Sequence, residues 1–527
     1  MTRRRRIRCS LLAAGAIAGW GLALLPLAWV VGGGAVSVAG AGRAAVADAV
    51  AWRLWGRSVT IALVATLLAM GVGLPAGWAL ARARLPGRGG WWAAASLPLL
   101  LPPYGMVVAA LFLHERFGSG TVVPAWAGVA LGLPVAIATA AIVLAAGTWP
   151  VVAILVALAA RSVPRELEDA ARLERTDGGA AWFAAWPHLR ASWLAGGMFV
   201  FLSAFANYSV GDSLGLPTFA REILMRFRAD FSQATAARLG SLALLVAFPL
   251  VAIQRGWLLR VALAPVASEP LPALRGSGRL VAGIAALAGA LAISAALPVT
   301  ALAIHASERE GWQLALAAGW DPLIQSATLA GAAALLSLLL AMALGASVAL
   351  RSSARRSWAD LVATLPYALP ASLLAIGMVW AIDRILVRAL PAVWFDRSPL
   401  ALAWVGALLG LPYAYWLMAP AWSRIDRDLD GDALLHGAGA WARWRHVVWP
   451  ALAGPAGVAG AVVFALVARE MEATVILRPP GWYPLAFAVW DALHFGSREQ
   501  AAATCLLMVG GTGLVIAAPL AIALRRR

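Results

Sequence analysis

Long apolar runs separated by short polar segments make up most of the sequence. Twelve runs are long enough to cross a membrane, since about 20 apolar residues in a helix span the hydrocarbon core. They predict helices near residues 11–31, 58–81, 91–113, 136–160, 191–211, 234–254, 279–304, 325–350, 358–382, 399–420, 451–469 and 500–523. A further apolar stretch, 121–135, predicts an interfacial or re-entrant piece. The pattern therefore predicts an all-α polytopic membrane protein of about 12 transmembrane helices.

The first run follows five arginines in Met1–Arg8 and could be a cleavable signal. We interpret it as a retained helix, because it is long enough to span and an equivalent helix opens the second half of the chain.

A polar segment from Ser423 to Pro450 interrupts the apolar pattern. Its first part carries acidic residues that favour a helix N-terminus, at Asp426, Asp428, Asp430 and Asp432. Leu429, Ala433 and Leu434 then form a short apolar stripe. Gly437 can take the left-handed conformation that ends a helix. The segment predicts two short helices, hinged at glycines on the membrane face, that can press into a groove of a partner.

A second copy of this segment occupies residues 163–187. A constant offset aligns four pairs: Arg165 with Arg427, Glu166 with Asp428, Leu167 with Leu429, and Ala171 with Ala433. A one-residue deletion then aligns Trp186-Pro187 with Trp449-Pro450. Two matching loops imply two matching docking sites.

Further matches extend the repeat along the chain. Those outside the loops are Pro98 with Pro366, Pro102 with Pro370, Gly197 with Gly460, and Phe201 with Phe464. Prolines inside membrane helices are tolerated where neighbouring groups satisfy the backbone, so paired prolines indicate packed, functional helices. The sequence predicts two parallel six-helix halves, residues 1–257 and 279–527, joined by a linker at 258–278.

The two polar segments resemble the EAA loops of permease subunits in binding-protein-dependent ATP-binding-cassette (ABC) importers. Asp169-Ala170-Ala171 match Glu-Ala-Ala in the first copy, where Arg175 replaces the glycine of the pattern. Gly431-Asp432-Ala433 stand at this place in the second copy, with Gly437 at the glycine and Val447 and Trp449-Pro450 at the ending. The resemblance covers nearly the whole chain, and its nearest form is the fused two-half permease of iron(III)-type importers.

The resemblance implies partners, a substrate and site residues. ABC ATPase subunits, expected as a homodimer, would dock on the two loops, and a solute-binding protein would dock on the outer face. The expected substrate is iron(III) or a ferric chelate, with thiamine, phosphonates or another small solute as alternatives. The implied ATPase-coupling residues are Glu166, Glu168, Asp169, Ala170, Ala171, Pro187, Asp428, Leu429, Gly431, Asp432, Ala433, Gly437 and Pro450.

Composition and charge agree with a membrane protein. The chain is 62% hydrophobic and 13% charged, with a mean hydropathy of +0.80. Its net charge of +17 could indicate nucleic acid, but the arginines flank apolar runs, so topology is the simpler cause and lipid the expected partner. With the N-terminus inside, the predicted cytoplasmic segments hold 27 of the 42 arginines. The positive-inside rule thus places both termini and both loops in the cytoplasm, at the inner (plasma) membrane.

Polar residues gather at corresponding ends of two predicted helices. The fifth ends in Asn207, Tyr208 and Asp212, and the eleventh in Arg469, Glu470 and Glu472, with Asn207 aligned to Glu470. They predict a polar gate or substrate path between the halves. An outer-leaflet Arg469–Glu pair that reaches water is an equal alternative. Beyond them, residues 215–217 and 478–484 resemble matched outer turns.

Motifs for catalysis and metal binding are absent from the sequence. It contains no GxxxxGK[ST] phosphate loop, so ATP hydrolysis is expected in a partner subunit. Its six histidines are dispersed without metal-ligand spacing, and we expect no metal and no cofactor. Two other classes stay open. A proton- or ion-coupled transporter of 12 helices needs mid-membrane carboxylates, which are nearly missing. A membrane enzyme needs a constellation that we do not find.

Overall fold

The computed structural model describes residues 26, 28–29, 48–117, 132–230, 233–262, 278–307, 309–317, 319–349, 360–389, 391, 393–423, 425 and 427–525. These residues form helices and connecting turns, without a strand. Most of the predicted first helix, most of the 121–135 piece and most of the linker lie outside them. The helices of the first predicted half are α3 (Ala49–Arg82), α4 (Arg88–Ser96), η1 (Leu97–Leu99), α5 (Pro103–Phe117), α6 (Leu133–Arg161), α7 (Arg165–Arg172), α8 (Asp177–Phe205), α9 (Ser209–Ser213), α10 (Phe219–Asp230) and α11 (Gln233–Ala262).

The second predicted half contains the remaining helices. Its helices are α12 (Gly278–Leu291), η3 (Ala292–Ala296), α13 (Leu297–His305), α14 (Arg309–Leu316), α15 (Asp321–Ala349), η4 (Leu365–Ala368), α17 (Ala371–Ala381), η5 (Ile382–Leu386), α18 (Val387–Ala389), α19 (Val393–Asp396), α20 (Leu400–Ser423), α21 (Arg427–Leu435), α22 (Ala440–Arg443), η6 (Trp444–Val448), α23 (Trp449–Ala468), α24 (Glu472–Leu477), α25 (Leu485–Phe495) and α26 (Arg498–Arg525).

Seven helices among the described residues are long and apolar enough to cross a membrane, and two bent helix pairs raise that number to nine. Helices α8 and α26 lie where the fifth and twelfth spans were predicted but are not among these nine. The described chain is thus the all-helical, multi-span structure that the sequence predicts, and the number of twelve stays a prediction.

Helices α3, α6 and α8 pack as one unit. Gly73 and Gly77 of α3 lie against Val152 and Val156 of α6, so these two helices run parallel. A Cβ atom at Gly77 would lie 2.4 Å from the carbonyl oxygen of Ala153, so only glycine permits this approach. Helix α8 runs antiparallel to both.

Helices α15, α20 and α23 form a second unit with the same directions. Gly345 of α15 lies against Trp422 and, further back along both helices, Ala333 lies against Gly406, so α15 and α20 run parallel. Gly406 and Gly410 contact Val467 and Val463, so α23 runs antiparallel to α20. Small residues thus set the close helix packing in both units.

The predicted helices 91–113 and 358–382 are each broken at the paired prolines. The segment Gly89–Leu99 meets Pro103–His114 at 85°, and Asp360–Ala368 meets Ala371–Leu386 at 111°. Prolines lack a backbone N–H and restrict the residue before them, which prevents a continuous helix there. The sequence comparison paired these prolines but did not predict the breaks, and the predicted continuous helices are wrong.

Three other predicted boundaries differ in the structure. Helix α11 continues to Ala262, into the predicted linker. Helix α8 begins at Asp177 and contains Pro187, and the helix that contains Pro450 begins at Ala440. The predicted starts of these two helices, near residues 191 and 451, therefore lie after the observed ones. A π-helical turn, η6, ends at Val448, just before Trp449-Pro450, and such a turn accommodates the disrupted hydrogen bonding.

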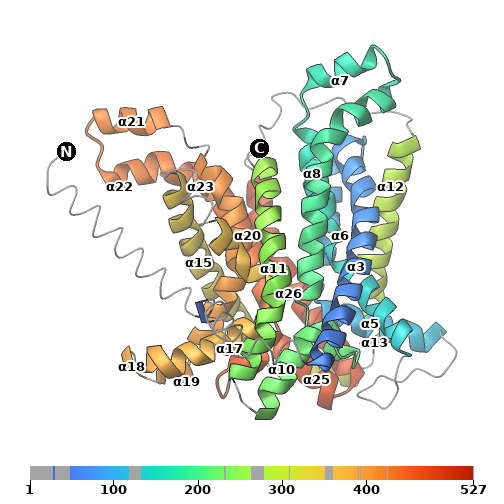
Figure 1. Cartoon of the computed structure of the whole chain (residues 1–527), viewed down its shortest axis with the longest axis vertical. Helices are drawn as coiled ribbons and strands as arrows, with labels where there is room; N and C mark the ends of the chain where they lie inside the picture. The colour runs from blue at the N-terminus through green and yellow to red at the C-terminus, as the bar shows by residue number, and fades with distance from the viewer. Residues whose placement is uncertain are drawn as a thin grey trace.

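Aromatic side chains join the two units. Phe199 of α8 stacks on Tyr367 of η4 with 5.4 Å between ring centroids, and it also contacts Tyr413 and Trp416 of α20. The Tyr367 hydroxyl donates to the side chain of Gln254 on α11. The two predicted halves therefore meet along α8, α11, η4 and α20 inside one helical body (Figure 1).

Candidate functional site

Short helices α7 and α21 lie at the same end of the molecule (Figure 1). Each connects two long helices, and each displays two leucines at matching positions of the repeat. Leu167 and Leu429 are 48% and 57% exposed, and Leu173 and Leu435 are 88% and 84% exposed. Exposed apolar side chains on a polar helix are typical of surfaces that bind a partner. We call α7 and α21 the coupling helices.

A buried ion pair fixes α7 to the end of α3. Nη2 of Arg82 lies 2.7 Å from both carboxylate oxygens of Glu168, and Arg172 reaches the same carboxylate at 2.9 Å. Glu168 is 1% exposed, so its side chain holds the predicted coupling loop from inside and does not lie on the surface. Glu166, Asp169 and Ala170 are exposed at this end of the molecule. Sequence reasoning missed Arg82, whose pairing depends on a contact between distant segments.

Gly437 ends α21 in the way that the sequence predicts. Its φ is +80°, in the left-handed region. The backbone N–H of Ala438 donates to the carbonyl of Ala433 at 2.9 Å, and that of Gly437 to Leu434 at 3.0 Å. These two bonds form a Schellman motif. Asp428 and Asp432 are exposed, and Gly431 and Ala433 are half-buried.

Asn207 and Glu470, which the sequence aligns, make the same local contact. Oδ1 of Asn207 accepts from the N–H of Val210, and Oε1 of Glu470 accepts from the N–H of Ala473, both at 2.9 Å. Each side chain thus caps the short helix that follows, α9 or α24. Helix α9 packs on α5, and α24 packs on α17.

The predicted outer turns, residues 215–217 and 478–484, also have matching backbone features. Gly215 and Gly481 both have positive φ, +61° and +81°. After each turn, a serine of the neighbouring long helix caps the next helix. The N–H of Phe219 donates to Ser58 at 2.9 Å, and the N–H of Leu485 donates to Ser326 at 2.7 Å. The repeated pattern Ser-x-Thr at 58–60 and 326–328 was the signal that could have identified these serines.

Arg469 forms no ion pair with the two carboxylates near it in the sequence, so the predicted outer-leaflet pair is wrong. Its Nη1 donates to the carbonyl of Leu101 at 2.9 Å, at the break between η1 and α5. Glu470 caps α24, and Glu472 faces the first backbone N–H groups of α17, at Ala371 and Ser372. Arg469 therefore connects α23 to the broken helix of the other predicted half.

Asp212 links the two predicted halves at the end opposite the coupling helices, where α10 and α25 lie (Figure 1). Its carboxylate lies 3.1 Å from Arg221 and 3.3 Å from Nε2 of His494 in α25. Burial opposes charge at Asp212, but the contacts to His494, Tyr208 and Arg221 lower its pKa. Burial likewise opposes charge at His494, but the contact to Asp212 raises its pKa. Tyr208 is buried beside them.

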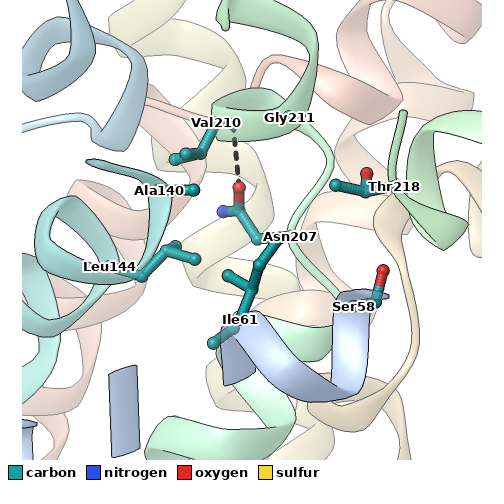
Figure 2. Close-up of a pocket in the computed structure, with 9 residues that line it drawn as sticks. Ser58, Ile61, Ala140, Leu144, Asn207, Val210, Gly211 and Thr218 are labelled. Atoms are coloured by element: carbon teal, nitrogen blue, oxygen red, sulfur yellow. Dashed lines mark hydrogen bonds between the residues drawn. The ribbon is translucent and has the colours of Figure 1, made fainter. Parts of the chain in front are cut away.

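A small cavity lies beside Asn207 within the first predicted half (Figure 2). Ser58, Ala140, Leu144 and Gly211 contribute to its wall. The bond from the backbone of Val210 orients the amide of Asn207 (Figure 2). Since residues of α3, α6, α8 and α9 enclose this cavity, it does not lie between the halves. The described residues hold no group of three or more side chains suited to a metal ion.

Known proteins similar to this chain are transport permeases. A protein named as the putative 2-aminoethylphosphonate transport system permease protein PhnV, from Salmonella paratyphi A, is 28% identical over 201 residues, which are 38% of this chain and 73% of that protein. Its counterparts from Salmonella typhimurium and Salmonella choleraesuis are 27% identical over the same shares. No family model matches the chain.

Proposed function

We propose that this chain is the permease of an ABC importer, driven by a separate ATPase that docks on α7 and α21. One observation carries the proposal: two coupling helices, with leucines exposed at matching positions, lie at one end of a multi-span helical protein (Figure 1). A homodimeric ATPase has two equal grooves, and two matching helices would fill them.

The lengths of the relatives support a fused permease with two halves. Because the same 201 residues are 38% of this chain and 73% of the relative, the relative is about half as long as this chain. The matched caps at Asn207 and Glu470, and the matched serines Ser58 and Ser326, support equivalent folds for residues 1–257 and 279–527. Such a chain would supply both halves of a transport unit by itself.

Orientation follows from the arginine distribution. The coupling helices would lie on the cytoplasmic side of the inner membrane. The outer turns at Gly215 and Gly481 would lie on the opposite side, where they would face a solute-binding protein. The polar residues Asn207, Tyr208, Asp212, Arg469, Glu470 and Glu472 belong in this proposal to the path or gate between the halves.

A phosphonate-type solute is the proposed substrate. The relatives are named for 2-aminoethylphosphonate, and the comparisons give no support to iron(III). An ion-coupled secondary transporter is not favoured. Such a protein is driven by an ion gradient and docks no ATPase, so the matched coupling helices would have no role in it.

Reconstitution with the ATPase and the solute-binding protein tests the function. We expect uptake of 2-aminoethylphosphonate into proteoliposomes that requires ATP, all three components and a supply of solute outside. Uptake by this chain alone, driven by a proton or sodium gradient, would show that it is a secondary transporter. A chain that binds no ATPase would also refute the proposal.

A further inference from the structure

Arg469 is a cation placed inside the helical body, and among the described residues no carboxylate lies within ion-pair distance of it. Its guanidinium donates from Nη1 to the carbonyl of Leu101. No ion pair joins it to a carboxylate among the described residues, although Glu470 and Glu472 stand close to it in the sequence. The guanidinium has five N–H donors, so most of its capacity is left for another partner.

The surroundings of Arg469 make an uncompensated charge costly. Leu101 lies in the break of a candidate span, between Gly89–Leu99 and Pro103–His114. Tyr104, on the far side of the break, donates its hydroxyl toward the backbone carbonyl of Arg469. Charges among membrane helices pair with one another or line a path for a solute, and broken backbone at this depth occurs where it is buried or lines a cavity.

The second predicted half has an equivalent break, and there a carboxylate faces the start of the helix that follows the break. There the break precedes α17, and the carboxylate of Glu472 faces the first N–H groups of that helix. In the first half the break precedes α5, and the residue aligned with Glu472 is Ser209. The first half therefore supplies no carboxylate of its own at this position, and the second half contributes Arg469 beside it instead. An anion there would meet a cation and the positive end of α5.

We propose that Arg469 binds the anionic group of the transported solute as it passes between the halves. This inference rests on the proposed function and adds the charge of the substrate and the residue that recognises it. A phosphonate or phosphate group fits, because the planar guanidinium donates two parallel hydrogen bonds to such oxygens. A bare metal cation would be repelled, which independently argues against iron(III) as a free ion.

Direct binding to the purified full-length chain in nanodiscs tests this proposal without the ATPase. The probes are 2-aminoethylphosphonate, inorganic phosphate and ethylamine, which keeps the amine but lacks the phosphonate. We expect the two anions to raise the unfolding temperature of the wild type, since a ligand that binds the folded state stabilises it, and ethylamine to leave it unchanged. Arg469→Gln should weaken anion binding by roughly tenfold to a hundredfold. Arg469→Lys should have an anion affinity between that of the wild type and that of Arg469→Gln.

Arg57→Gln is the matched control, because Arg57 is an arginine outside this place that also bonds a backbone carbonyl, that of Pro217. It removes the same charge and should bind the anions as the wild type does. Equal binding by the wild type and Arg469→Gln, or no anion binding by the wild type, would overturn the proposal. If Arg469→Gln and Arg469→Lys lower the unfolding temperature equally without changing anion binding, Arg469 only packs the halves together. Loss of ATPase association would refute the proposed function and would not alter this binding result.

Discussion

Arg82 and Glu168 form a buried ion pair that attaches the first coupling helix to the end of α3, with Nη2 2.7 Å from both carboxylate oxygens. Nη2 of Arg172 lies 2.9 Å from Oε1 of the same glutamate. A displacement of α7 would therefore be passed to α3 and, through the close contacts at Gly73 and Gly77, to α6. The second coupling helix ends at a glycine hinge instead, so the two helices differ in how firmly they are held.

Neutralising Glu168 should destabilise the protein. Glu168→Gln keeps the shape but leaves Arg82 and Arg172 without their shared counter-charge, and breaking a buried pair costs about 3–5 kcal/mol. Asp169→Asn is the control, because Asp169 is exposed and its ion pairs are worth roughly 0–1 kcal/mol. Thermal unfolding of the purified variants measures the difference. Equal unfolding temperatures for the two variants would contradict the anchoring role of Glu168.

The contact between Asp212 and His494 should make stability depend on pH. Both residues lie in short helices outside the candidate spans. The pKa of His494 is raised above 6.5, so its stabilisation is full below pH 6.5 and is lost as pH rises through the raised value. The pKa of Asp212 is lowered below 3.8, so its stabilisation is full above pH 3.8 and is lost as pH falls through the lowered value. Both contributions are present together between pH 3.8 and 6.5.

The measurement compares the wild type with His494→Gln from about pH 5.5 to 8.5, a range around the ordinary pKa of histidine of about 6.5. We expect the wild type to be more stable at the acidic end, and the difference to shrink as pH rises. Arg228, which also acts on His494, opposes its protonation, and Arg221 competes for Asp212. A difference in unfolding temperature that is constant over this range would show that folding does not raise the pKa of His494 and would contradict the predicted ion pair with Asp212.

Local patterns in the sequence marked several special backbone positions, although only the turn at Gly437 was predicted, and the breaks at the paired prolines and the helix caps at Asn207 and Glu470 were not. The glycine at 437, the paired prolines at 98 and 366, and the alignment of Asn207 with Glu470 all mark positions with a specific backbone geometry. Proline and glycine constrain φ within the chain itself, so a single sequence shows them. The extent of α8 back to Asp177 was missed, because its first turns are amphipathic and only tertiary packing settles them.

Pairs between distant segments could not be predicted in the same way. Arg82 meets Glu168, and Arg469 meets the carbonyl of Leu101, across separations of 86 and 368 residues. Neither periodicity nor composition states which helix lies beside which. For Arg469, the carboxylates nearest in the sequence suggested a local ion pair. Glu470, one of these carboxylates, instead caps α24.

The exposed leucines of both coupling helices should contribute to ATPase binding. Leu173→Asp and Leu435→Asp each place a charge in a contact that would be desolvated on docking. We expect each to weaken co-purification with the ATPase by roughly tenfold to a hundredfold, as loss of a buried leucine implies. Leu316→Asp in α14 is the control, with an exposed leucine outside the coupling helices. Unchanged co-purification of both coupling-helix variants would exclude these surfaces from the interface.

Changing Gly437 should disrupt the second coupling helix alone. Its φ of +80° costs a residue with a side chain about 1 kcal/mol or more, and a β-branched residue more still. Gly437→Val would therefore shift the turn and reorient α21, which carries Leu429 and Leu435. Open space surrounds the position, so the effect would come from the backbone and not from a clash. Since no membrane helix is touched, expression and insertion should be unchanged while ATPase co-purification falls.

Gly431→Ala provides the matched control for that experiment. Gly431 lies inside α21 without a positive φ, and a methyl group added there would meet no atom within 4 Å. Alanine there should stabilise the helix by roughly 0.5–1 kcal/mol, and because it keeps the direction of α21 it should reduce ATPase binding far less than Gly437→Val does. If Gly437→Val co-purifies with the ATPase and supports uptake as fully as Gly431→Ala does, the segment from Ser423 to Pro450 is an ordinary loop and does not transmit the motion of the ATPase.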